Sequence, residues 1–343
     1  MKLTSVERRE FAEYIRLFDF SEQLRDKSIL LTGAGGMTGI GIIKWILLTN
    51  ELYGTNIKIF ASTRKPDIRP DFLEEGDAVE YCKFGCEEQT WGEVVFDYII
   101  HCAAPTGREF FVSNPVETFE VIVDGTKNIL ELARKQEKCR VIYLSSMDIY
   151  GTINSELPVK ENFISAIDNC IIRNAYPLGK KGAEFLCHAY RQEYGVDVVI
   201  IRPASMQGLL QPYQEPRIFN EILRCIIEEK NLVLKSDGTG KKCFLYTLDA
   251  ISAIFCVLLK GISGEVYNVT NPETFIQLKD LARRIFEKFA PQCDVIIELQ
   301  DIKETGYLPT FSFVQDNEKI YNLGWKMNRT IEEIYEVDVE RFQ

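Results

Sequence analysis

The sequence predicts an α/β fold in which a doubly wound parallel sheet carries a smaller C-terminal lobe. Three observations lead to this prediction. Short apolar segments alternate with longer segments of helical periodicity, as in consecutive βαβ units. A glycine-rich loop follows the first of these apolar segments, at residues 33–39. The alternation stops between about 203 and 245 and resumes at 248–270, which places the lobe outside the sheet.

The first element is an amphipathic segment at residues 4–26, where apolar positions recur at helical spacing among charged ones. Phe11, Tyr14 and Ile15 belong to its apolar face. We expect an N-terminal helical extension at residues 1–26 that either binds a partner or caps the edge of the sheet. Its charged start, with no apolar stretch behind it, differs from the pattern of a signal peptide.

The sheet is expected to form from apolar runs of strand length that are joined by helices. Strands are predicted at 28–32, 56–61, 96–101, 140–144 and 196–201. Long helices are predicted from the glycine loop to about residue 50, at 115–136 and at 176–194. Crossovers between parallel strands are right-handed, so these units place helices on both faces of one sheet.

The composition excludes several classes of protein. A net charge of −11 and a pI near 5.0 argue against a nucleic-acid partner, because such proteins bind phosphates with Lys and Arg. The chain has no apolar run of about 18 residues, so we expect no membrane span. It has two His, and its ten Cys form no CxxC or Cys/His cluster, so we expect no metal site. Scattered Cys are typical of a reduced, cytoplasmic protein.

The glycine loop has the spacing of a dinucleotide-binding turn. Gly33, Gly36 and Gly39 stand at its first, fourth and seventh positions, between a strand and a helix. Gly33 permits the tight turn, Gly36 lets the backbone approach a pyrophosphate, and Gly39 lets the helix pack on the strand. The N–H groups of Met37 and Thr38, at the start of the helix, face the phosphates. The sequence therefore predicts a Rossmann domain that binds NAD or NADP.

The end of the second predicted strand bears on the choice between NAD and NADP. An NAD-binding domain commonly has an acid there, which binds the ribose 2′-hydroxyl. Here the strand runs into Ala61, Ser62, Thr63, Arg64 and Lys65, without an acid. Arg64 or Lys65 suits a 2′-phosphate, so we assign Ser62 and Arg64 to the cofactor site with a slight preference for NADP. A solvated basic loop accounts for the same residues equally well.

Ser146, Tyr176 and Lys180 form the candidate catalytic set. Ser146 follows a predicted strand, at the end where parallel sheets bind ligands. Tyr176 and Lys180 stand one turn apart on one face of a predicted helix. A phenol has a pKa near 10, which a neighbouring ammonium lowers. Tyr176 is then expected to take the proton of an alcohol whose carbon gives hydride to the nicotinamide, while Ser146 hydrogen-bonds the oxygen.

Together these motifs resemble the extended short-chain dehydrogenase/reductase family, in its nucleotide-sugar epimerase and dehydratase branch. The resemblance covers about residues 27–330 and also rests on the strand end 100–104 and on 264–269. It implies that Ser146, Tyr176 and Lys180 are catalytic and that the substrate is a nucleotide sugar. It also implies a homodimer that is formed through the two long helices after residue 115.

The resemblance further assigns binding residues. Ala103 and Ala104 are expected to line the cofactor cleft, and Pro203 to pass the nicotinamide. Ser205 and Lys242 are expected to face the substrate. Lys242 stands where the family usually has an Arg that binds the substrate diphosphate. A Lys offers a point charge in place of the bidentate geometry of an Arg.

The predicted domains follow from these assignments. The Rossmann domain is expected at 27–202, and 246–270 returns to it. Segments 203–245 and 271–343 are expected to form the substrate-binding lobe.

The sequence leaves the reaction open between chemistries that share a transient keto-sugar. Asp148 stands where related 4,6-dehydratases and UDP-glucuronate-type decarboxylases usually carry Glu, which the dehydratases use to remove a proton beside the ketone. Met147 stands where many dehydratases have an acid, and it offers no proton. This pair favours an NAD(P)-dependent epimerase that works by reversible hydride transfer. A dehydratase or decarboxylase with Asp148 as an extra base, a keto-sugar reductase and a non-catalytic dinucleotide sensor are the alternatives.

Overall fold

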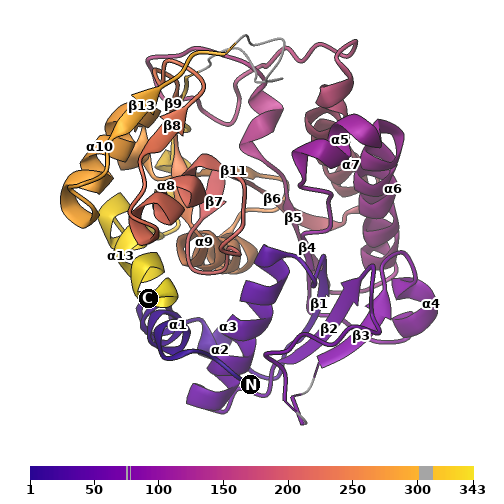
Figure 1. Ribbon diagram of the computed structural model, residues 1–343. Coiled ribbons are helices and arrows are strands. Elements are labelled where there is room, and N and C mark those ends of the chain that lie inside the picture. The colour runs from indigo at the N-terminus through magenta and orange to yellow at the C-terminus, as the bar shows by residue number, and fades with distance from the viewer. Residues whose placement is uncertain (75, 78, 301–311) are drawn as a thin grey trace.

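The computed structural model describes residues 1–74, 76–77, 79–300 and 312–343, and a seven-stranded parallel sheet lies at its centre (Figure 1). The strand order is β11-β6-β5-β4-β1-β2-β3. The order reverses between β1 and β4, the switch point at which such sheets bind ligands. The strands are β1 (Ser28–Thr32), β2 (Lys58–Thr63), β3 (Val79–Lys83), β4 (Tyr98–His101), β5 (Arg140–Leu144), β6 (Asp197–Pro203) and β11 (Val266–Val269). The predicted fold class is confirmed.

The five strands expected from the sequence correspond to β1, β2, β4, β5 and β6, with ends that differ by at most two residues. No separate strand was expected at β3. This strand lies at the edge of the sheet, with Glu80 exposed and Cys82 buried, so only part of it faces the core. An edge strand of this kind lacks the continuous apolar run that marks a strand buried on both faces.

Helices cover both faces of the sheet, and alternate strand residues point into two separate cores. Leu30 of β1 packs on the side of α6 (Pro115–Arg134) and α7 (Ala175–Tyr194). Its neighbours Ile29 and Leu31 pack on the side of α3 (Met37–Tyr53) and α9 (Thr247–Lys260). This alternation is the period of two expected for strands that are buried on both faces.

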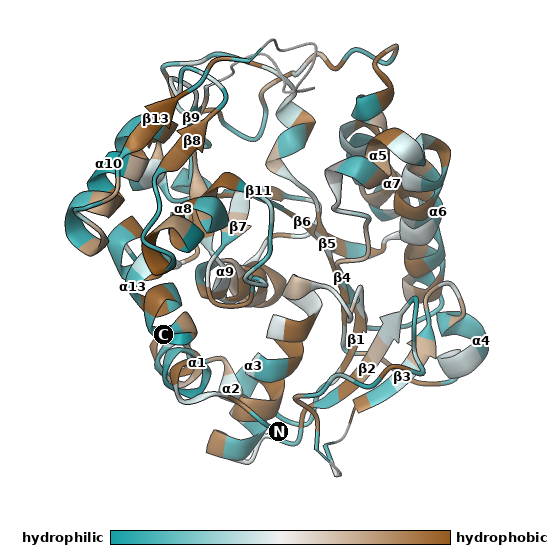
Figure 2. Ribbon diagram, viewed as in Figure 1, coloured by the Kyte–Doolittle hydropathy of each residue, from teal (hydrophilic) through white to brown (hydrophobic). Residues whose placement is uncertain are grey.

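Helix α9 is the centre of the larger core. Residues 247–258 are all buried, because α9 lies between the sheet and the helices α1 and α3. Figure 2 shows the apolar residues concentrated along the central strands and α9, while the outer helices alternate between apolar and polar faces. Within the described ranges, no helix is both long and apolar enough to cross a membrane.

The remaining elements form smaller units around the sheet. Three two-stranded sheets pair β7 (Ser205–Gln207) with β10 (Phe244–Tyr246), β8 (Leu232–Leu234) with β13 (Val295–Ile297), and β9 (Lys241–Lys242) with β12 (Ile276–Gln277). The other helices are α4 (Glu87–Trp91), α5 (Arg108–Ser113), α8 (Ile218–Ile227), α10 (Leu278–Phe289), α12 (Glu318–Tyr321), α13 (Ile331–Phe342), η1 (Met147–Tyr150), η2 (Ile172–Asn174) and η3 (Pro272–Thr274). Most of these elements come from 203–245 and 271–343. That these segments bind a substrate stays a prediction.

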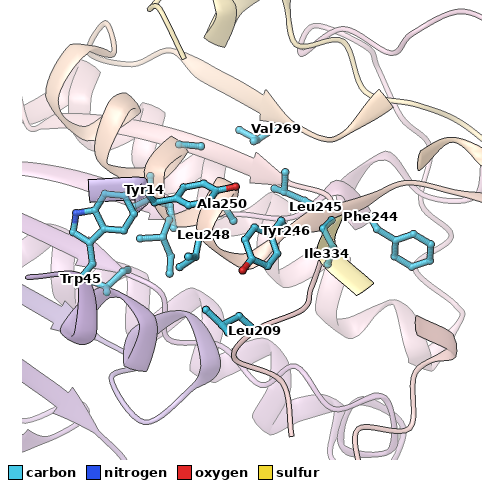
Figure 3. Close-up of a cluster of buried hydrophobic side chains, with 14 of the residues drawn as sticks. Tyr14, Trp45, Leu209, Phe244, Leu245, Tyr246, Leu248, Ala250, Val269 and Ile334 are labelled. Atoms are coloured by element: carbon cyan, nitrogen blue, oxygen red, sulfur yellow. The ribbon is translucent and has the colours of Figure 1, made fainter. Parts of the chain in front are cut away.

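The N-terminal extension forms two helices, α1 (Ser5–Leu17) and α2 (Ser21–Leu24). A capping box of Thr4 and Glu7 begins α1. Phe11, Tyr14 and Ile15 are buried as expected, and α1 packs on α3, α9 and α13. Figure 3 shows Tyr14 among side chains of α3, α9 and β10. The extension therefore lies on helices of its own chain and not along β3 or β11, the edges of the sheet.

Buried polar groups line the contact of α1 with α9 and α13. The Tyr14 hydroxyl donates to Asp249 Oδ1 at 3.0 Å, and the Tyr246 hydroxyl donates to Glu10 Oε2 at 3.2 Å. Burial raises the pKa of Asp249, and that of Asp338 in α13, to about 7. Both values exceed the ordinary pKa of an Asp carboxyl. Each carboxyl therefore favours the folded state while it is protonated, and this contribution to stability is lost as the pH rises to about 7.

Candidate active site

The glycine loop is pressed against the end of the neighbouring strand. Gly33 has φ +71°, and a Cβ on it would lie 2.9 Å from the nitrogen of Ala103, which follows β4. A Cβ on Gly39 would lie 2.4 Å from the Gly33 oxygen. Real Cβ atoms do not approach so closely, so only glycine permits this path of the chain. The two glycines have the roles in close backbone packing that the sequence predicts.

This loop fits the pyrophosphate of a dinucleotide. Gly36 is the N-cap of α3, and its carbonyl accepts the helical hydrogen bond from Ile40 N at 2.9 Å. The N–H groups at Met37, Thr38 and Gly39 precede that bond and have no partner within a helix. Both Gly35 and Gly36 are exposed, which leaves the loop open to a ligand. The positive end of a 17-residue helix therefore faces the open loop.

A buried histidine joins the strand before the loop to the neighbouring strand and to α6. Thr126 Oγ1 donates to the Ile122 carbonyl at 2.6 Å, so it accepts from His101 Nε2 at 3.1 Å. Nδ1 of His101 then accepts from the Thr32 hydroxyl at 2.7 Å. Burial lowers the pKa of His101 to about 3, which keeps the ring neutral as these bonds require. His101 thus joins β1, β4 and α6 and is not an acid–base group at neutral pH.

The end of β2 carries Ser62 and Arg64, which the sequence assigns to the cofactor site. Ser62 is fully buried, and its hydroxyl donates to Glu87 of α4. The other oxygen of Glu87 accepts from Gly85 N at 2.8 Å. The Ser62 side chain is therefore engaged inside the protein, whereas Arg64 is exposed. Sequence reasoning missed Glu87, because α4 lies 25 positions after Ser62 and no local pattern joins them.

The structure brings Ser146, Tyr176 and Lys180 together at the carboxyl end of β5. Ser146 caps η1, and its hydroxyl accepts from Asp148 N at 3.1 Å. Ser146 is close enough to the Tyr176 phenol to lower its pKa. Lys180 Nζ donates to the Leu144 carbonyl at 2.6 Å and lies 5.8 Å from the centre of the Tyr176 ring. A strand end, a capping turn and one helical face therefore hold the three side chains.

The electrostatics of the pair differ from the sequence-based expectation. Burial raises the pKa of Tyr176 above its ordinary value, and the Asp148 charge raises it further, although the Ser146 hydrogen bond and Arg217 lower it. Burial lowers the pKa of Lys180 to about 8. We expected the ammonium to make the phenol acidic, but loss of water around Tyr176 raises the pKa of the phenol instead. At neutral pH the phenol is protonated and the amine is mostly cationic.

Phe111 covers one face of the phenol. This residue of α5 stacks on Tyr176 with ring centres 4.7 Å apart and an angle of 11° between the planes. Offset stacking of this kind fixes the plane of the ring and keeps water from it. Sequence reasoning missed Phe111, since the six-residue α5 is too short to show a periodic pattern.

The remaining predicted residues lie at the ends of neighbouring strands. Ala103 and Ala104 follow β4, and Pro203 ends β6. Ser205 begins β7 and accepts from Gln207 Nε2 at 2.8 Å. Lys242 lies in β9, but its side chain falls outside the part of the chain that the structure describes. In the described ranges, no His, Cys, Asp and Glu side chains are grouped to hold a metal ion.

Comparison with known proteins places this site in a family. A model described as the NAD dependent epimerase/dehydratase family matches residues 29–270. UDP-glucuronic acid decarboxylase 1 of Danio rerio is 25% identical over 261 residues, which are 76% of this chain and 60% of that protein. The chain thus matches less than two thirds of the length of this relative.

Two solved structures share the fold. One is dTDP-glucose 4,6-dehydratase of Bacillus anthracis in complex with NAD, with a TM-score of 0.73, 20% identity, and 92% of this chain and 96% of that chain covered. The other is UDP-glucose 4-epimerase of Thermotoga maritima with UDP-glucose, with a TM-score of 0.75, 19% identity, and coverages of 92% and 98%. The family model covers most of the sheet and the site around it. The chain belongs to the NAD-dependent epimerase/dehydratase family.

Proposed function

We propose that this protein is an NAD(P)-dependent nucleotide-sugar epimerase that acts through a transient keto-sugar. One observation carries the proposal: Ser146, Tyr176 and Lys180 meet at the end of β5, beside a glycine loop that fits a dinucleotide. Met147 is half-buried beside them and offers no proton for expelling water from the sugar. Such a site suits oxidation and reduction of one ring carbon, without loss of a group.

Ser146, Tyr176 and Lys180 each have a separate role in the proposed proton transfer. When bound, a nicotinamide dinucleotide supplies a reversible hydride acceptor. The Ser146 hydroxyl is placed to hydrogen-bond the sugar oxygen, and the Tyr176 phenol to exchange a proton with it. The cationic Lys180 favours the phenolate while the proton is on the sugar side. Because the free phenol is protonated at neutral pH, it is ready to donate when the ketone is reduced.

We propose NADP as the preferred cofactor, on the basis of the β2 end. The strand ends without an acid, which would repel a 2′-phosphate. The guanidinium of the exposed Arg64 suits a 2′-phosphate. Glu87 does not replace that acid, because it is buried and both its oxygens accept hydrogen bonds inside the protein. Calorimetric titration with NAD⁺ and NADP⁺ compares the two directly.

Asp148 favours a second candidate, a decarboxylase or dehydratase. Its side chain is exposed, and its charge acts on the Tyr176 phenol, so a second acid–base group stands near the reacting position. Removal of a proton beside a ketone requires such a base. The Danio rerio relative is named as a UDP-glucuronic acid decarboxylase. These two observations make decarboxylation the main competitor of epimerisation.

Product analysis tests the proposal. The protein is incubated with UDP-glucose, UDP-glucuronate or dTDP-glucose and a catalytic amount of NAD⁺ or NADP⁺, and products are followed by NMR and mass spectrometry. An epimerase gives an isomer of unchanged mass without net reduction of cofactor, and Asp148→Asn retains this activity. Loss of carbon dioxide or of water, abolished in Asp148→Asn, would instead establish the second candidate. A reductase would run in reverse under these conditions, and would convert the oxidised cofactor to NADH or NADPH in a one-to-one ratio with a released keto-sugar.

We also propose that the protein is a homodimer through α6 and α7. Their outer faces expose Val116, Phe119 and Phe185, and the last of these is 70% exposed. Exposed apolar groups on adjacent helices are typical of an association surface.

We propose a cytoplasmic location for the protein. All ten cysteines lie in the described ranges and form no disulfide there, which supports this location.

Phe185→Glu is expected to convert the dimer to a monomer, because a charge would be buried without a partner. Sedimentation velocity at micromolar concentration measures the change. Ile262→Glu is the matched control: Ile262 is 66% exposed in the turn after α9 and belongs to neither helix, and this variant is expected to keep the assembly of the wild type. Equal sedimentation of Phe185→Glu and wild type would rule out this interface.

A further inference from the structure

A buried ion pair lies directly beneath the catalytic helix face. Glu184 stands one helical turn after Lys180 in α7, and Arg202 is the next-to-last residue of β6. Arg202 Nε donates to Glu184 Oε1 at 2.9 Å, and Nη2 donates to Oε2 at 2.6 Å. Both side chains are buried, and the bidentate geometry fixes the position of the carboxylate.

Arg202 also holds the turn that carries Ser146. Its Nη1 donates to the Tyr150 hydroxyl at 2.8 Å and to the Glu161 carbonyl at 2.9 Å. Tyr150 ends η1, the turn that Ser146 caps, and its hydroxyl donates to Asn268 Oδ1 of β11 at 2.7 Å. One guanidinium thus joins the two segments that supply the catalytic set, η1 and α7, to the same strand.

Glu184 is the anion among the groups that act on Lys180. The other titratable groups that face Lys180 or contact it are neutral at pH 7; they are His101, Cys102, Tyr143, Tyr176 and Cys187. Burial lowers the pKa of His101 to about 3, raises that of Cys102 to about 12, and raises those of the two tyrosines and Cys187. The charge of Asp148 acts on Tyr176. Burial lowers the pKa of Lys180, whereas Cys102, Glu184 and Cys187 raise it. Of these three residues, Glu184 is the one that forms an ion pair.

We propose that the Glu184–Arg202 pair is the positioning unit of this site. It fixes α7 and η1 on β6, and the Glu184 carboxylate keeps the buried Lys180 amine in its cationic form. The proposal rests on the proposed function, because a cationic Lys180 matters only where Tyr176 exchanges protons. Neither residue has to touch sugar or cofactor, so both act through Lys180, Tyr176 and Ser146.

The test measures the pKa of Lys180 directly and needs no sugar substrate. The full-length chain is labelled with ¹³C at the lysine side chains, and the Lys180 signal, assigned by its absence in Lys180→Met, is followed by NMR as the pH changes. Glu184→Gln is expected to lower the Lys180 pKa by about one pH unit, since an anion is lost and the Arg202 cation remains. Glu184→Asp, which keeps the charge, is expected to restore most of the wild-type value.

Two comparisons separate this effect from a loss of structure. Glu193→Gln removes an equal charge from the exposed end of the same helix and is expected to leave the Lys180 titration unchanged. An unchanged titration in Glu184→Gln, or equal shifts in the Gln and Asp variants, overturns the proposal. If no nucleotide sugar is turned over while the Lys180 pKa still falls, only the proposed function fails. With a substrate, the basic limb of the kcat profile moves to lower pH in Glu184→Gln.

Discussion

Tyr176→Phe is expected to lower kcat by about two to four orders of magnitude, the range that a positioned acid–base group contributes. The variant keeps the ring that stacks on Phe111, so the site retains its shape. It loses the hydroxyl that lies near Ser146 and that we propose as the proton-exchanging group. Turnover is measured by NMR with the nucleotide sugar that gives product in the wild type, and cofactor binding by calorimetry, which is expected to change little.

Tyr190→Phe provides the control for this prediction. Tyr190 lies in the same helix, and its hydroxyl donates to Glu131 at 2.5 Å, away from the candidate site. This variant loses one hydroxyl of the same kind and is expected to keep the kcat of the wild type. Near-normal turnover in Tyr176→Phe would reject Tyr176 as the acid–base group, whatever reaction the protein catalyses.

Gly33→Ala is expected to weaken dinucleotide binding at least about tenfold and to destabilise the fold. An alanine at φ +71° costs about 1–2 kcal/mol of conformational energy, as at any left-handed position. At Gly33 its Cβ also lies 2.9 Å from Ala103 N and from the Cys102 carbonyl carbon, which are backbone atoms that cannot turn away. The loop must move, and its N–H groups leave the pyrophosphate. Calorimetry with NAD⁺ and NADP⁺, together with urea unfolding, measures both effects.

Gly195→Ala separates the two causes. Gly195 ends α7 with φ +72°, almost the same as Gly33, but a Cβ on it would meet nothing within 4 Å. This variant is expected to lose about 1–2 kcal/mol of stability from conformation alone and to bind the cofactor normally. If Gly33→Ala binds the dinucleotides as tightly as Gly195→Ala does, the crowded glycine loop is not the binding site.

The sequence predicts those parts of the molecule whose signals are local. The Gly33–Gly39 spacing, the apolar runs of five strands and the Tyr176–Lys180 spacing each occupy a few consecutive residues, and the structure has all of them. Parallel sheets bury their strands on both faces, so their sequences are apolar throughout and easily recognised. β3 and the short α5 lack this signal.

Residues that meet across long separations could not be predicted in the same way. Glu87 contacts Ser62 from helix α4, and Arg202 contacts Glu184 and Tyr150 from β6. The predicted direction of the shift in the Tyr176 pKa was also wrong, because this shift depends on how completely the fold removes water from the phenol. Local spacing places the ammonium but says nothing about this desolvation.

Helix α1 also constrains the order in which the chain folds. Arg9 forms two bonds with Glu340, at 2.7 and 2.6 Å, between residues 331 positions apart. During synthesis the ribosome releases residues 5–17 long before 331–342, so the surface that shelters Phe11 and Tyr14 is incomplete for most of translation. Contacts of such long range form slowly. Until they close, the early segment leaves an aromatic face exposed, the kind of surface to which chaperones bind.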